Sequence, residues 1–304
     1  MTGAQPPAGW QRTTHALIIA LILTITMPTA CAAVRPPTPP TDIAARPPAP
    51  PGPTTEPRTS RDRLRLLADA ITPVAADAEH SPHTYLHLQS WSRATTVVSR
   101  RDIRRWSQPD GSGRVIERQL PDRGDLTRLP DGTDRDALAA APVVSDRTYG
   151  HGGLVRPGSE PVPGDRAGLQ QHLGTISPPE NGPGSTITAV VSLNNEHYLG
   201  HHQRQTILLI LADLPGITTT TTATDIAGRT GTAVSLNHDG STKRLIIHPT
   251  SGELLAFQET FNTCRPARGK PCPRPGLFDY RLYLERSHTT PLNPHREAVD
   301  TTSP

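Results

Sequence analysis

Aromatic residues and lysine are scarce in this sequence. Phe, Tyr and Trp together make up 4% of the 304 residues, and Lys243 and Lys270 are the only lysines, so arginine carries nearly all of the positive charge. The 31 basic and 28 acidic residues are interleaved and leave a formal net charge of +3. A nucleic-acid-binding protein would gather basic residues on one face. The sequence therefore argues against nucleic acid as a partner.

Catalytic signatures are missing as well. The chain has no G-x-S-x-G nucleophile elbow, no glycine-rich phosphate loop before a helix and no S-x-x-K pattern. We therefore predict no catalytic residues, no cofactor and no enzyme activity. Serine and histidine are plentiful, so a convergent catalytic triad, and with it an enzyme of unrecognised type, is the alternative.

No apolar run is long enough to span a membrane. The run from Ala16 to Met27 is shorter than the roughly 20 residues that a spanning helix needs, and Pro28 closes it. Such a run is typical of the apolar part of a secretory signal peptide. We expect residues 1–31 to be that signal peptide and the protein to be exported.

Cys31 directly follows this run. Thr29 and Ala30 precede it as small residues do in a bacterial lipobox, although Pro28 stands where leucine is usual. In one interpretation Cys31 is lipidated and holds the protein at the outer face of the cytoplasmic membrane. In a second, signal peptidase cuts at an A-x-A-like site and the protein is secreted. An uncleaved anchor is the third.

The remaining cysteines, Cys264 and Cys272, flank a short loop rich in proline and glycine. In an exported protein such a close pair is predicted to form a disulfide, and two free thiols are the alternative. Lipidation of Cys31 would leave only these two cysteines and therefore no unpaired thiol. A zinc site needs four ligands, and no second Cys/His cluster supplies them. We therefore predict no metal site here.

Glu196, His197, His201 and His202 form the best remaining cluster of metal-ligand types. On a helix, His197 and His201 would share one face and could chelate a transition metal. Gly200 weakens a helix at this point, so we favour a solvated helix start and predict no metal.

Proline divides the chain into regions. Many of its 34 prolines lie in residues 32–58, which cannot bury apolar surface and favour an extended polyproline II tether. We predict a single α+β domain over residues 59–287 and a polar tail over 288–304.

Periodicity predicts the elements of that domain. Helices are expected over Ser60–Ala70, with Ser60 as the cap, over Asp165–Leu173, and within Ile187–Leu214, with Asn194 or Asn195 as a cap. Little regular structure is expected from Asp122 to Pro163. Alternation and Asp-Gly turns predict strands over residues 85–91, 97–106, 115–120, 218–222, 232–236, 244–248, 254–259 and 277–285.

These elements predict a curved antiparallel sheet that wraps around a few helices. A cleft between sheet and helices would bury an apolar ligand against Ile207, Leu211, Val234, Ile247 and Phe257. The same five residues can equally form an ordinary core.

The strand over residues 97–106 carries four arginines. Arg101 and Arg105 would share one face with Ile103, whereas Arg100 and Arg104 would share the other with Trp106. Such a patch could meet anionic lipid headgroups. The alternative, which we favour, is a solvated sheet face balanced by Asp102.

Four phrases resemble a family of exported actinobacterial proteins of uncharacterised function. They are RRWSQPDGSGR, LADLPGI, DIAGRTGTAV and HPTSGELLA, at residues 104–114, 211–217, 225–234 and 248–256. The family is similar in architecture to the lipoprotein-carrier fold, which includes mycobacterial lipid-binding lipoproteins and periplasmic sensors that control anti-sigma factors. The resemblance implies a curved sheet with an apolar cleft and no catalytic residues.

Our leading hypothesis is an exported, lipid-anchored cell-envelope protein that binds an apolar or amphipathic ligand, such as a lipid, in a sheet–helix cleft. The alternative is an envelope interaction or sensor protein that contacts another membrane protein through its sheet edge or cysteine loop.

Overall fold

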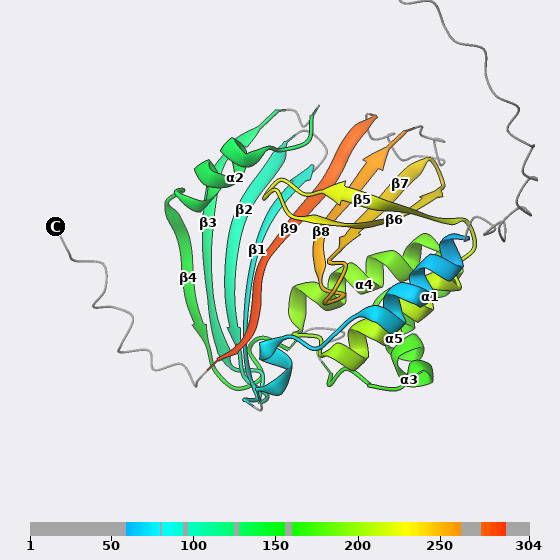
Figure 1. Cartoon of the computed structure of the whole chain (residues 1–304). Helices are drawn as coiled ribbons and strands as arrows, with labels where there is room; N and C mark the ends of the chain where they lie inside the picture. Colours follow the sequence, from blue (N-terminus) through cyan, green and yellow to red (C-terminus); the bar gives the residue numbers. More distant parts are fainter. Residues whose placement is uncertain are drawn as a thin grey trace, which may run out of the picture. The chain divides into compact units, whose positions relative to one another are not determined.

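The computed structural model describes residues 59–79, 81–93, 97–124, 128–155, 160–262 and 275–289 (Figure 1). The predicted signal peptide, Cys31, the tether, and Cys264 and Cys272 lie outside these residues. So does the predicted tail from residue 290 onward. None of the helices in the described part is both long and apolar enough to cross a membrane.

Nine strands form one sheet in which every neighbouring pair is antiparallel. Their order is β4-β3-β2-β1-β9-β8-β7-β6-β5. The strands are β1 His83–Arg93, β2 Val98–Ser107, β3 Gly113–Arg123, β4 Val143–Tyr149, β5 Ile217–Thr224, β6 Thr230–His238, β7 Ser241–Ile247, β8 Leu254–Phe261 and β9 Gly276–Thr289. The predicted combination of a large antiparallel sheet with helices is confirmed.

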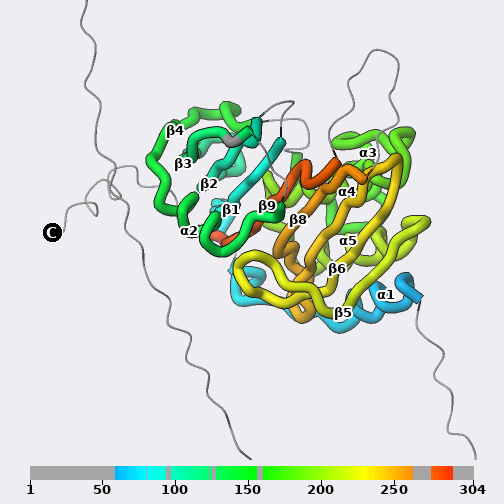
Figure 2. Tube along the Cα trace, turned by 90° about the horizontal axis from the view of Figure 1, so that it is seen from above, coloured from blue at the N-terminus to red at the C-terminus, as the bar shows by residue number. Residues whose placement is uncertain are grey.

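The sheet consists of two meanders joined in the middle by strands from opposite ends of the domain. β1 pairs with β9, for example Trp91 with Tyr280, and β9 pairs with β8, for example Leu282 with Ala256. The strands predicted over residues 254–259 and 277–285 are therefore neighbours in the sheet. Figure 2 shows β1–β4 on one side of β9 and β5–β8 on the other.

Five α-helices occur among the described residues. They are α1 Ser60–Ala70, α2 Gly132–Ala139, α3 Arg166–Ile176, α4 Gly184–Glu196 and α5 His201–Ala212, with 3-10 turns η1 Ala75–Ala78 and η2 Pro179–Asn181. Helices α1, α3, α4 and α5 gather beside the β5–β8 half, whereas α2 lies beside the β1–β4 half (Figures 1 and 2).

Three local predictions were wrong. Helix α1 is capped by Thr59, not Ser60, because Thr59 Oγ1 accepts a hydrogen bond from Asp62 N and the Asp62 carboxylate accepts one from Thr59 N. Asn194 lies inside α4 and donates to the Val190 carbonyl at 2.8 Å, so it caps nothing. Asn195 also lies inside α4, and α5 begins after Gly200.

The third error concerns residues 122–163, which contain β4 and α2. An Asp131–Asp134 capping box begins α2, and Leu138 anchors it with a fully buried side chain. Most side chains of β4 are exposed, so its sequence shows no apolar alternation.

Two cores lie on opposite faces of the sheet. On the helix-side face, strand residues such as Val234, Leu245 and Phe257 pack with residues of the four helices, such as Leu64 and Leu211. The opposite-face core contains Trp91, Val98, Leu138, Ala233, Ile246, Ala256 and Leu282. Alternate side chains of the same strand thus belong to two different buried layers, in agreement with the predicted alternation.

The predicted turn at Asp239–Gly240 is confirmed. Both residues have positive φ, 45° and 73°, as the tight hairpin between β6 and β7 requires. Asp225 likewise holds a turn: its carboxylate accepts from Ala227 N and from Arg229 Nε, and Gly228 has φ of 80°.

Candidate functional site

A groove lies on the helix-side face of the β1–β4 half. Its volume is about 660 Å³, within the range of small-molecule sites. Strands β1–β4 line it, together with the last residues of α4 and Arg281 of β9. Three other cavities formed by the described residues are smaller, with volumes of about 260, 50 and 20 Å³.

Strand register explains which side chains line the groove. Leu86, Leu88 and Ser90 alternate along β1 and therefore point to one face. On β2 their partners are Arg105, Ile103 and Arg101, in that order. The predicted grouping of Arg101, Ile103 and Arg105 on one face is therefore confirmed.

Apolar side chains form the middle of the groove. Leu88 and Ile103 face each other across β1 and β2, and Leu86 and Val115 lie one row further along the strands. Leu86 and Leu88 are buried, and Ile103 packs against the helix-side core. This part of the groove suits an alkyl chain.

Arginine dominates the charge of the groove. Its lining residues include five arginines, Arg93, Arg101, Arg105, Arg147 and Arg281, but only two glutamates, Glu117 and Glu196. Some of the positive charge is compensated. Arg101 pairs with Glu117 at 3.0 Å, Arg105 pairs with Glu196, and Arg281 pairs with Asp279 of the same strand at 3.0 Å.

Asp279 sits at the margin of the groove and is 6% exposed. Burial raises the pKa of its carboxyl, even though Arg281 beside it acts in the other direction. One carboxylate oxygen, Oδ2, pairs with Arg281, whereas Oδ1 has no hydrogen-bond partner among the described residues. The charged form of this aspartate is therefore poorly stabilised.

The end of α4 forms one wall of the groove and is fixed to the sheet by Tyr283. The Tyr283 hydroxyl donates to Asn195 Oδ1 at 2.8 Å, and burial raises its pKa to about 12. The next residue, Glu196, reaches Arg105 of β2. These contacts separate the open groove from the helix-side core.

The five residues predicted to line a ligand cleft come together in the helix-side core. Ile207, Leu211, Val234, Ile247 and Phe257 are each at most 6% exposed, and none borders the groove. The cavity beside Ile207, Leu211 and Ile247 holds only about 20 Å³, room for about one water molecule and far too little for a lipid. Ligand binding among them stays a prediction, while the large groove lies elsewhere.

The histidine cluster is split by the break between α4 and α5. His197 is the extended residue after α4 and His201 begins α5, so they do not share a helical face. Among the described residues, no group of three His, Cys, Asp or Glu side chains is placed to hold a metal.

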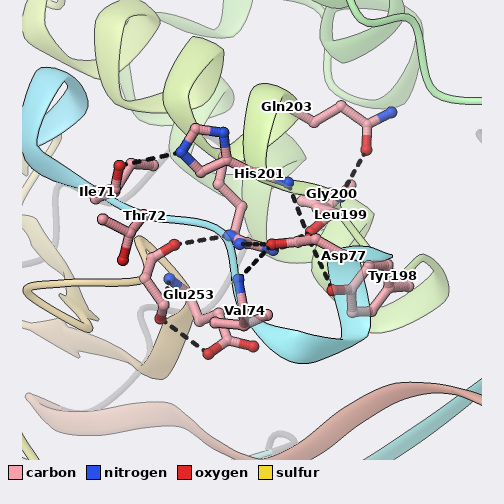
Figure 3. A network of polar contacts seen from close by, with 12 residues as sticks. Ile71, Thr72, Val74, Asp77, Tyr198, Leu199, Gly200, His201, Gln203 and Glu253 are labelled. Atoms are coloured by element: carbon pink, nitrogen blue, oxygen red, sulfur yellow. Dashed lines mark hydrogen bonds and ion pairs between the residues drawn. The ribbon is translucent and has the colours of Figure 1, made fainter. Parts of the chain in front are cut away.

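A buried polar network surrounds Asp77 of η1 (Figure 3). Arg204 of α5 pairs with both Asp77 oxygens, at 2.7 and 3.0 Å, and both side chains are buried. Asp77 also accepts from the Tyr198 hydroxyl and from the backbone N–H groups of Val74 and His201. Arg204 donates further to the carbonyls of Leu199 and Ser251.

This network stabilises the fold, because the Asp77 carboxylate and the Arg204 guanidinium are both paired and hydrogen-bonded. Burial would raise the pKa of Asp77, but hydrogen bonds from Arg204, Val74 N and Tyr198 outweigh it and lower the pKa. The network joins η1, α5 and the turn before β8.

The arginines of the opposite face also have local partners. Arg104 approaches the fully buried Asp102 at 3.8 Å, as the predicted balance by Asp102 requires. Asp102 also accepts from Gln89 and bonds His87, each at 2.9 Å, and Arg100 donates to the Pro121 carbonyl. This face is thus a packed layer, and the prediction of a solvated face was wrong, because Asp102 and Arg100 are buried beside the opposite-face core.

No protein-family model, curated protein or solved structure matches the chain.

Proposed function

We propose that this is an exported cell-envelope protein that binds an apolar or amphipathic ligand in the groove of the β1–β4 half. The groove itself carries the proposal. Its volume of about 660 Å³ suits a small amphipath, and its lining combines an apolar middle with a few charged groups, as ligand sites do.

The architecture supports the same proposal. An antiparallel sheet with four helices on one face and a hollow beside them agrees with the lipoprotein-carrier-like fold that the sequence resemblance implies. We further propose that lipidation of Cys31 tethers the domain at the outer face of the cytoplasmic membrane.

A groove-filling substitution tests the binding proposal. Ile103→Trp should lower the affinity for a dansyl-labelled fatty acid at least tenfold, because the larger ring occupies the apolar middle. Ile116→Trp is the matched control, since Ile116 lies on the neighbouring strand β3 and points to the opposite face. Fluorescence titration measures both. Absence of binding to the wild-type protein, or equal losses in both variants, would overturn the proposal.

Intact mass spectrometry of the protein from its native membrane fraction tests the tether. We expect a diacyl or triacyl mass on Cys31, and loss of membrane association in Cys31→Ser. A soluble product that begins after Cys31 would contradict the tether and leave ligand binding unaffected.

A second candidate function, an envelope interaction protein, is favoured by β4. This strand is one edge of the sheet, and its Val143 and Val144 are 47% and 56% exposed. An edge strand can accept an extended segment from another protein. Crosslinking in the native membrane should then recover a partner whose yield falls in Val144→Lys. An unchanged yield would remove this candidate.

A further inference from the structure

The groove is polar at one end and apolar in its middle. Beyond the apolar row formed by Leu88 and Ile103, the next row across the strands contains Arg281, Ser90 and Arg101. The row after that adds Ser92 and Ser99 to the lining. Hydroxyl and guanidinium groups are thus concentrated at this end.

Ser90 lies between the two arginines. It is the register partner of Arg281 on β9 and of Arg101 on β2, so the three residues occupy one row on three adjacent strands. Side chains directly opposite each other in antiparallel strands have Cβ atoms about 5 Å apart. Arg101 and Arg281 lie on the two strands that flank β1, so their Cβ atoms are about twice as far apart, about 10 Å. Both side chains are long enough to converge above Ser90, where their guanidinium groups can donate to two oxygens of one phosphate or carboxylate.

The present partner of Arg101 is easily exchanged. Arg101 pairs with Glu117 at 3.0 Å, but the Arg101 side chain is 48% exposed. Exposed ion pairs of this kind contribute little, since water and salt screen them. An anionic ligand group that reaches into the groove can therefore replace Glu117.

We propose that this end of the groove, formed by Arg101, Arg281 and Ser90, is the subsite for the anionic headgroup of an amphipath. Its apolar chain lies along Leu88 and Ile103. Five arginines line the groove against three carboxyl groups, Glu117, Glu196 and Asp279 at its margin, and this excess gives it the complementary charge. The inference rests on the proposed function and adds the chemistry of the ligand.

Isothermal titration of the full chain with three probes tests the headgroup subsite. The probes are n-dodecyl phosphate, n-dodecyl maltoside and inorganic phosphate, with both detergents below their micelle concentrations. We expect n-dodecyl phosphate to bind at least tenfold more tightly than n-dodecyl maltoside. Inorganic phosphate should bind much more weakly than n-dodecyl phosphate.

Substitutions of a positively charged and a negatively charged residue of the groove test the subsite further. Arg101→Gln should lower the affinity for n-dodecyl phosphate at least fivefold and change the affinity for n-dodecyl maltoside by less than twofold. Glu117→Gln should raise the affinity for n-dodecyl phosphate, because it removes the carboxylate that pairs with Arg101. Arg104→Gln is the matched control. Arg104 lies on the same strand as Arg101 and its side chain is 38% exposed, but this side chain points to the opposite face of the sheet.

The outcomes separate this inference from the proposed function. If neither detergent binds, the proposed function fails and the inference falls with it. If both bind equally and Arg101→Gln acts like Arg104→Gln, the groove binds amphipaths but has no headgroup subsite. If inorganic phosphate binds as tightly as n-dodecyl phosphate, the site takes a free anion and the assignment to an amphipath is overturned.

Discussion

The helix-side face of the sheet is covered over β5–β8 and open over β1–β4, and β9 lies at the boundary. On the covered half it carries Leu245, Ile247 and Phe257, which pack against α4 and α5 in one core. On the open half the same face carries Arg101 and Arg105, and among the described helices only the end of α4 lines the groove. One sheet thus forms a core on one half and lines an open groove on the other.

Two buried aspartates show the same contrast. Asp77, on the covered side, receives hydrogen bonds from four residues and has a lowered pKa. Asp279, at the groove margin, has one unpartnered oxygen among the described residues and a raised pKa. Complete pairing indicates a group that supports the fold, whereas the unpartnered oxygen of Asp279 leaves its charged form poorly stabilised.

The largest expected effect comes from breaking the Asp77–Arg204 pair. Asp77→Ala should lower the free energy of unfolding by about 3–5 kcal/mol, because Arg204 would remain buried without its counter-charge. Urea denaturation followed by circular dichroism measures this loss. Asp69→Ala, at an exposed position of α1, is the control. A loss below about 1 kcal/mol would show that Arg204 finds another partner or water.

Matched truncations on the two halves should differ clearly. Leu245→Ala on β7 should lower the free energy of unfolding by about 2–5 kcal/mol, because Leu245 is fully buried in the helix-side core. Ile103→Ala on β2 should lower it by less than about 1 kcal/mol, because Ile103 is only half-buried and borders the groove. Equal losses in the two denaturation curves would contradict the division into a covered and an open half.

The two aspartates should give opposite pH dependences. The folded pKa of Asp77 is lowered, so its stabilising contribution is present above the unfolded pKa, about 3.9, and is lost as the pH falls through the folded pKa. The folded pKa of Asp279 is raised, so its contribution is present below the unfolded pKa and is lost as the pH rises through the folded pKa.

Asn variants isolate each contribution. As the pH rises from about 3 to about 6, the free energy of unfolding of the wild type minus that of Asp77→Asn should increase. The same difference between the wild type and Asp279→Asn should decrease. Thermal unfolding at a series of pH values measures both differences. Curves of the same sign would show that the pairing around the two carboxyl groups is equivalent.

The smallest effect is expected from Arg101→Gln, which should change the free energy of unfolding by less than about 0.5 kcal/mol. Its side chain is half exposed, and its pair with Glu117 lies on the open face. Chemical denaturation beside the wild-type protein tests this. A loss above about 1 kcal/mol would assign Arg101 to the fold rather than to the ligand.

Sequence patterns predicted the β6–β9 meander well, because Asp-Gly turns and alternation act locally and each strand has at least one buried face. They missed α2, which is short and anchored by few buried side chains, and β4, which lies exposed at the edge. Alternation also placed Arg101 and Arg105 beside Ile103. It could not show that their face is open, because this depends on where α4, remote in sequence, ends.

The pairing of β1 with β9 has a consequence for biosynthesis. Ser81 Oγ donates to the Thr289 carbonyl, 208 residues further along the chain, at the seam between the two meanders. Until β9 has been synthesised, β1 has a free edge at what becomes the centre of the sheet. Folding that depends on such distant contacts is slow. The sheet of a nascent chain therefore cannot close at its centre until β9 emerges.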